Sequence, residues 1–124
     1  MAEACTITEE TIGSVKKIKW AWTSAADGTV GAAAVSSTTT NAYSGECLRL
    51  ITDPGATAPT DDYDVVINDA DGVDVLIGAG ANRDATATEQ VIASSLGCVA
   101  NDTLTLLVTN AGSGKTGTTY LYIR

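Results

Sequence analysis

The stretch VKKIKWAWTS, residues 15–24, has the clearest pattern in the chain. Apolar side chains fall at every second position: Ile18, Trp20 and Trp22. Lys17 and Lys19 fall at the alternate positions, with Ala21 and Thr23. Successive side chains of a β-strand point to opposite faces of a sheet. The stretch is therefore predicted to be a strand with a cationic face and an apolar face, whose tryptophans are core or interface anchors.

The remaining sequence also favours strands and tight turns over helices. Thr, Ala, Gly and Val dominate, and Phe is absent. Small and β-branched residues suit strands and turns. Further strands are expected at residues 47–52, 63–68, 73–78, 103–110 and 118–124. We predict an all-β fold, an antiparallel β-sandwich or barrel of about seven to eight short strands.

Turn signals between these strands predict how they connect. Asp69-Ala70-Asp71-Gly72 joins the strands at 63–68 and 73–78 into one hairpin, and the glycine-rich stretch after residue 110 joins the last two strands into another. Residues 29–40 are predicted to be a weak strand or a flexible loop. Asp84 is a candidate N-cap for the segment that follows it, which is predicted to be a short helix or an irregular strand.

Length and charge limit the domain organisation and the classes of partner. A chain of 124 residues forms one domain, residues 1–124, with residues 1–14 as a candidate extended N-terminal arm. Seven basic and fifteen acidic residues give a net charge of −8. This charge disfavours nucleic acid and anionic membranes as partners. No apolar stretch approaches the length of a membrane span, and no basic-then-apolar leader opens the chain, so Sec-type export is not expected.

The residue types needed for catalysis are poorly represented. The chain has no histidine, the commonest general base and zinc ligand. Cys5, Cys47 and Cys98 are odd in number and scattered, so they are expected to be buried or free thiols of a chain made in a reducing cytosol. A thiol enzyme would need a base beside one of them, and no histidine can supply it. Residues 53–74, the acidic tract, hold seven acids and no base. Paired carboxylates hydrolyse glycosides only beside a suitable cleft, so a solvated acidic rim is the favoured interpretation.

The stretch Gly-Ser-Gly-Lys-Thr, residues 112–116, resembles a phosphate-binding loop. That motif requires a first glycine where this chain has Thr109, and a helix directly after the loop. Gly117-Thr118-Thr119-Tyr120 follows instead and is typical of a strand. We therefore predict a glycine-rich turn, with no nucleotide, other cofactor or small-molecule substrate.

Asp69, Asp71 and Asp74 beside Gly72 resemble part of a calcium-binding loop. If Gly72 is the invariant glycine, the first and last ligand positions are Ile67 and Gly78, neither of which has a carboxylate. A polar turn without a metal is therefore expected. An interstrand calcium site remains the alternative.

A candidate partner interface lies within the opening strand. We assign Lys16, Lys17, Lys19 and Trp22 to it. Two interpretations stay open: a docking surface for an acidic partner, or a solvated strand face whose lysines guard a sheet edge.

Residues 48–124 resemble a family of small structural proteins of tailed bacteriophages. The resemblance is carried by a TDPG…APT…YD segment (residues 52–64), DADGVDVL (69–76), ANR (81–83) and LVTNAG…KTGT (107–118). These motifs are turn and strand signatures without catalytic residues. They imply a β-rich, non-enzymatic virion protein, made in the bacterial host cytoplasm and located in the phage head.

Within that class the expected role is a capsid decoration (cement) protein that binds the major capsid protein or another virion protein. A homo-oligomer is expected, preferably a trimer, because ring symmetry multiplies contacts on a repeating lattice. A head–tail completion or tail subunit is the first alternative. A carbohydrate-binding or adhesive β module is the second, which the low aromatic content disfavours.

Overall fold

The computed structural model describes residues 3–31 and 36–124. Eight strands and one short 3-10 helix, η1, follow one another: β1 (Ala4–Ile12), β2 (Val15–Thr23), β3 (Tyr43–Pro54), β4 (Asp64–Asn68), β5 (Glu89–Ile92), η1 (Ala93–Ser95), β6 (Cys98–Asp102), β7 (Thr105–Thr109) and β8 (Thr116–Ile123). The prediction of an all-β chain is confirmed.

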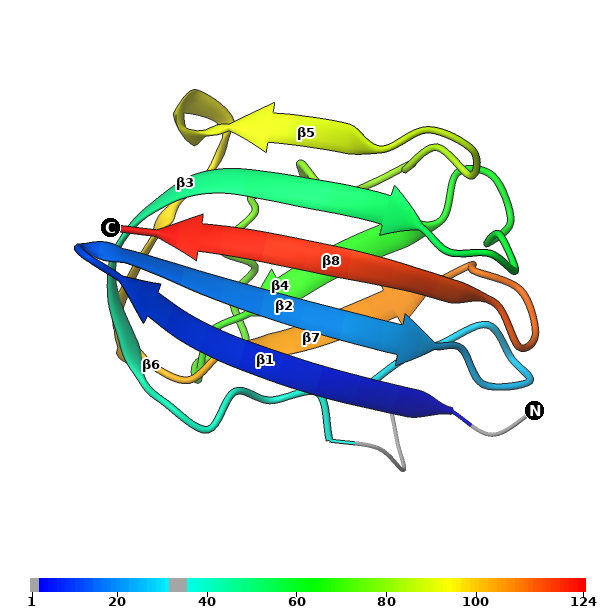
Figure 1. Cartoon of the computed structure of the whole chain (residues 1–124), viewed down its shortest axis with the longest axis horizontal. Coiled ribbons are helices and arrows are strands. Elements are labelled where there is room, and N and C mark those ends of the chain that lie inside the picture. Colours follow the sequence, from blue (N-terminus) through cyan, green and yellow to red (C-terminus); the bar gives the residue numbers. More distant parts are fainter. Residues whose placement is uncertain (1–2, 32–35) are drawn as a thin grey trace.

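Two layers of antiparallel strands make a sandwich. The larger sheet has the order β1-β2-β8-β3-β5, with β6 paired to β3, and the smaller sheet consists of β4 and β7. In Figure 1 the larger sheet lies in front and the smaller one behind. The larger sheet ends at β1 and β5 and does not close on itself. The fold is therefore a sandwich and not a barrel.

The core lies between the layers, where alternating side chains of both sheets meet. Ile18 and Trp20 of β2 are completely buried and Trp22 is 3% exposed. They face a layer that supplies Val65, Ile67, Leu106 and Val108. The Trp20 indole N–H donates to the Ser37 carbonyl at 2.8 Å, so the polar atom of the buried ring is satisfied. The apolar face predicted for this strand is thus the core face.

The hairpin predicted for residues 63–78 forms only around its turn, where an isolated antiparallel bridge joins Asn68 and Asp74, and the strand predicted at 73–78 is wrong. Strand β4 pairs with β7 over its whole length, and residues 75–80 form consecutive turns. The Asp74 carboxylate accepts hydrogen bonds from the backbone N–H groups of Ile67, Leu76 and Gly78. These bonds hold the chain in turns, so Val75 and Leu76 are both buried where a strand would have placed them on opposite faces.

The second predicted hairpin is also wrong, although both of its strands exist. β7 belongs to the smaller sheet and β8 to the larger, where β8 pairs with β2 and β3. The glycine-rich stretch between them is therefore a turn that crosses from one layer to the other. An alternating strand pattern specifies a buried face, but it does not specify the pairing partner.

The N-terminal segment is not an extended arm. Residues 4–12 form β1, which pairs with β2 along its full length and is an edge strand of the larger sheet. In the segment 29–40, Val30 and Thr38 form isolated bridges to β7, and residues 32–35 lie outside the described part. The segment after Asp84 becomes the short strand β5, and the Asp84 carboxylate accepts the Ala87 N–H at 2.9 Å.

Candidate functional site

The outer face of the larger sheet carries a cluster of cations and tyrosines. The cross-strand register places Lys17 opposite Tyr122 and Lys19 opposite Tyr120, and Arg49 of β3 is also opposite Tyr122. These residues lie on the face turned away from the core. We call them the cation–tyrosine face: Lys17, Lys19, Arg49, Tyr120 and Tyr122.

The cations of this face lie over the tyrosine rings. Lys17 Nζ is 5.4 Å from the ring centre of Tyr120 and 5.9 Å from that of Tyr122. Lys19 Nζ is 6.0 Å from the Tyr120 ring centre, and Arg49 Cζ is 5.4 Å from that of Tyr122. Contacts at this distance are cation–π interactions. They fix the positions of the charges while leaving them available to an acidic group.

The cation–tyrosine face is unusual for this chain. Three of its seven cations lie there, although acids outnumber bases fifteen to seven. Among residues 3–31 and 36–124 the one ion pair is Arg83–Glu89, at 3.7 Å, so no cation of the face is paired within the described chain. Unpaired positive charges gathered on an acidic protein attract acidic partners.

A shallow hollow adjoins the cation–tyrosine face on the same sheet. Its volume is about 310 Å³, and small residues line it: Ala4, Thr6, Ala21, Thr23, Gly55, Thr116, Gly117 and Thr118. Trp22 also borders it, and the lack of a side chain at Gly117 leaves room for the buried Trp22 indole beneath this strand. On the opposite flank Ile92 is 68% exposed. The outer face therefore combines cations, tyrosines, a hollow and an exposed apolar side chain, and of these Tyr and Arg are the residue types enriched at protein interfaces.

The structure brings together two of the four predicted interface residues. Lys17 and Lys19 lie on the cation–tyrosine face, whereas Lys16 lines a separate cavity of about 400 Å³ with Glu9 and Tyr43. The prediction that Trp22 belongs to the interface is wrong, because its ring is buried. The ring centres of Trp22 and Tyr63 are 5.8 Å apart, and the indole N–H donates to Thr119 Oγ1 at 3.3 Å. A strand alternates its side chains, so Trp22 cannot share a face with Lys17 and Lys19.

Sequence reasoning missed three members of the face. Arg49, Tyr120 and Tyr122 each alternate with buried residues: Leu50 beside Arg49, and Leu121 and Ile123 beside the tyrosines. This alternation identifies their outward direction. It does not reveal that β8 lies between β2 and β3, and that order is what assembles the face.

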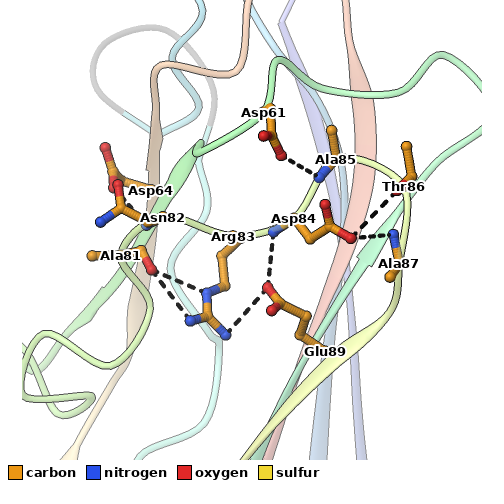
Figure 2. Close-up of polar contacts among 10 residues, drawn as sticks. All are labelled: Asp61, Asp64, Ala81, Asn82, Arg83, Asp84, Ala85, Thr86, Ala87 and Glu89. Carbon is orange, nitrogen blue, oxygen red and sulfur yellow. Dashed lines mark hydrogen bonds and ion pairs between the residues drawn. The ribbon is translucent and has the colours of Figure 1, made fainter.

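The acidic tract is only partly the solvated rim that we expected. Five of its seven carboxylates accept hydrogen bonds that fasten loops: Asp53, Asp61, Asp64, Asp69 and Asp74. Figure 2 shows Asp61 accepting from the Ala85 N–H at 3.2 Å and Asp64 accepting from the Asn82 N–H at 2.9 Å. Arg83 lies between them, donating to the Ala81 carbonyl and pairing with Glu89. These five carboxylates therefore stabilise the conformation of the loops.

The structure groups three carboxylates, but they are not the three that the sequence suggested as a calcium site. Carboxylate oxygens of Asp69, Asp71 and Asp102 lie within 4.8 Å of one another. Burial, followed by the charges of Asp69 and Asp71, raises the pKa of Asp102 above its usual value. Asp74 is not part of the cluster; its carboxylate instead accepts three backbone N–H groups.

The Gly-Ser-Gly-Lys-Thr stretch is a turn that leads into a strand. Gly112 and Gly114 have φ angles of 84° and 64°, which favour glycine. The Lys115 N–H donates to Ser24 Oγ at 2.8 Å, and the Thr116 N–H donates to the Thr57 carbonyl at 2.8 Å. Two amides that a phosphate loop would offer to its anion are thus already used, and β8 follows in place of a helix.

Two of the three cysteines have unreactive surroundings. Burial, followed by the nearby charge of Glu3, raises the pKa of the Cys5 thiol to about 11. Burial also raises the pKa of Cys47 to about 11. Both side chains are therefore protonated at neutral pH, and a thiol is a weak nucleophile compared with a thiolate.

Within the described residues 3–31 and 36–124, no helix has the length and apolar character needed to cross a membrane. Comparisons with models of protein families, with curated proteins and with solved structures found no match.

Proposed function

We propose that this protein is a non-enzymatic virion protein that decorates a phage capsid, docking through the cation–tyrosine face onto an acidic patch of the capsid surface. The observation that supports it is the concentration of three unpaired cations on one sheet face of a chain with net charge −8. The role in a virion comes from the sequence resemblance over residues 48–124.

The chemistry of the face suits an acidic protein surface better than a sugar. Carbohydrate-binding modules stack sugar rings on exposed aromatic faces, and Tyr120 and Tyr122 are the aromatic side chains on this face. Cations occupy positions over both rings, at 5.4 Å for the nearest cation in each case. A sugar would have to displace them, whereas a carboxylate would pair with them. The same face would also serve a head–tail completion or tail subunit.

Docking of this kind is sensitive to salt. Charges at the rim of an interface mainly set the association rate, and screening weakens them as the Debye length falls from about 30 Å at 0.01 M salt to about 8 Å at 0.15 M. We therefore expect Lys17→Ala with Lys19→Ala to weaken particle binding by about tenfold near 0.01 M salt and much less near 0.15 M.

The experiment is co-sedimentation with capsids of the encoding phage from which the protein has been stripped. Lys16→Ala is the matched control, because this lysine belongs to the same strand but lines the cavity on the other side. Thermal melts check that each variant is folded. The proposal fails if the double variant binds like the wild type at every salt concentration, or if mass spectrometry finds no such chain in purified particles.

A further inference from the structure

The larger sheet has one long strand edge without a partner. Strand β1 pairs with β2 on one side, and among residues 3–31 and 36–124 no other strand pairs with it. The opposite edge of the sheet is β5, which is only four residues long and runs directly into η1. The sheet can therefore be extended at β1 and hardly at all at β5.

The free edge lacks most of the features that natural proteins use to block strand addition; the exception is Glu9, a charged residue on the inner side of the strand, opposite Ile18. Its register with β2 runs without a bulge from Ala4 opposite Thr23 to Ile12 opposite Val15. The nine residues contain no proline and no lysine, and residues 4–8 carry no charge. Unprotected edges of this length favour pairing with another chain, whereas bulges, prolines and charges prevent it.

The inner side of this edge is incompletely buried. Cys5 and Ile7 pack against the core but remain partly exposed. The strand is held at two points, because the Glu3 carboxylate, just before β1, accepts the Gly31 N–H at 2.6 Å and the Glu9 carboxylate accepts the Thr40 N–H at 2.9 Å. A rigid strand with half-covered apolar side chains gains buried area from a neighbour at little entropic cost.

We propose that β1 pairs antiparallel with β1 of a second copy of this chain, across a twofold axis at Ile7. In this register Ile7 lies opposite its own copy and Thr6 lies opposite Thr8. The glutamates avoid one another, because Glu9 lies opposite Cys5, Glu10 opposite Ala4, and Glu3 opposite Thr11. Like charges directly opposite each other destabilise a sheet, so the sequence of β1 is compatible with itself in this register.

The dimer joins two larger sheets into one continuous sheet with two cation–tyrosine faces on the same side. It does not depend on the function proposed above, and it competes with the trimer that the sequence resemblance led us to expect. A strand-to-strand contact is smaller than a standard interface of about 800 Å² per partner, so we expect association in the micromolar range. If the protein also docks on a repeating surface, the two cation–tyrosine faces of one dimer bind to that surface at the same time.

Charge variants of β1 test the pairing. Thr6→Lys with Thr8→Lys places lysines opposite lysines in the dimer, and Thr6→Glu with Thr8→Glu places glutamates opposite glutamates. Both positions are exposed on the outer face. Thr8 lies opposite Lys19 of β2, so the lysine pair also adds repulsion within the monomer, whereas the glutamate pair does not. We expect each variant alone to dimerise at least about tenfold more weakly than the wild type, and an equimolar mixture of the two to form a heterodimer. Ser14→Lys, in the turn after β1, is the control for added charge.

Light scattering and sedimentation of the full chain measure the assembly, and thermal melts of diluted samples confirm that each variant folds. Cross-linking tests the register: in a Cys98→Ser background, oxidation is expected to join Thr6→Cys chains to Thr8→Cys chains and to join neither to itself. The proposal is overturned if the wild type stays monomeric at several hundred micromolar. It is equally overturned if the charge variants assemble like the wild type, or if their mixture shows no heterodimer.

Discussion

At the scale of single residues, the Glu9 carboxylate connects β1 to the loop before β3. It accepts hydrogen bonds from the N–H groups of Thr40 and Asn41, at 2.9 and 3.1 Å, and from the Tyr43 hydroxyl at 2.7 Å. Burial alone would raise the pKa of Glu9, but these hydrogen bonds outweigh it and hold the pKa below the ordinary value of 4.5. The ionised form is therefore favoured in the folded state.

This linkage predicts the pH dependence of one contribution to stability. A carboxyl group whose pKa is lower when folded stabilises the protein above its unfolded pKa, and that contribution is lost as the pH falls through the folded pKa. We expect Glu9→Gln to lower the free energy of unfolding by about 1 kcal/mol at pH 7, since the site is largely solvated. The difference from the wild type should begin to shrink as the pH falls below about 4.5 and should be lost as the pH falls through the lowered folded pKa.

Denaturant unfolding between pH 3 and pH 7 makes this measurement. Glu10→Gln is the control, since Glu10 is exposed and accepts no hydrogen bond from the described residues. A Glu9→Gln variant whose deficit stays constant across this pH range would contradict the assignment.

Single residues also explain why the strand predicted at residues 73–78 does not form. Val73, Val75 and Ile77 alternate as in a strand, yet Ile77 is 70% exposed and has a φ angle of 52°. A β-branched residue rarely adopts this conformation. The three backbone bonds to Asp74 hold it there. Side-chain capping competes with strand pairing, and local alternation carries no signal of which of the two prevails.

At the scale of elements, the strands most easily predicted are those with one face in the core. Strands β2, β3 and β8 each alternate buried and less buried residues, and each was expected near its observed position. Their order in the sheet is not a local property, because β8 comes last in the chain and lies between β2 and β3. This explains why Lys17 and Lys19 were predicted as site residues, whereas Arg49 and the two tyrosines were not.

The turn between β7 and β8 leads to a prediction about Ser24 and Lys115. Ser24 is completely buried, and its hydroxyl donates to the Gly112 carbonyl at 2.5 Å while accepting the Lys115 N–H at 2.8 Å. Ser24→Ala leaves both groups without a partner, so we expect a loss of about 1–3 kcal/mol in unfolding free energy. Lys115→Ala keeps the backbone bond, and we expect a change below about 0.5 kcal/mol.

Thermal or denaturant melts measure both changes, and calorimetry with ATP and magnesium tests the same turn for nucleotide. We expect no binding heat from the wild type or from Lys115→Ala. Micromolar nucleotide binding that disappears in Lys115→Ala would show that this turn acts as a phosphate site after all.

At the scale of the whole molecule, charge is distributed unevenly between the sheet face and the loops. Three cations share the outer face of the larger sheet, whereas the acidic tract spans the loops around β4. Two carboxylates of the tract, those of Asp62 and Asp71, are exposed and accept no hydrogen bond from the described residues. The molecule therefore has strong repulsion among its acids and a separate cationic surface.

This distribution predicts that salt has opposite effects on folding and on docking. Net repulsion in a chain of charge −8 destabilises the compact state, and added salt screens it. We expect sodium chloride to raise the free energy of unfolding by about 1 kcal/mol between 0.01 M and 0.3 M, while it weakens binding through the cation–tyrosine face. Asp62→Asn with Asp71→Asn should raise stability at low salt and reduce the salt response, whereas Lys17→Ala with Lys19→Ala should enlarge it. Unfolding titrations over a salt series measure these slopes. Stability that falls with added salt would show that attraction between the acids and the few cations, and not repulsion among the acids, dominates the electrostatics of the fold.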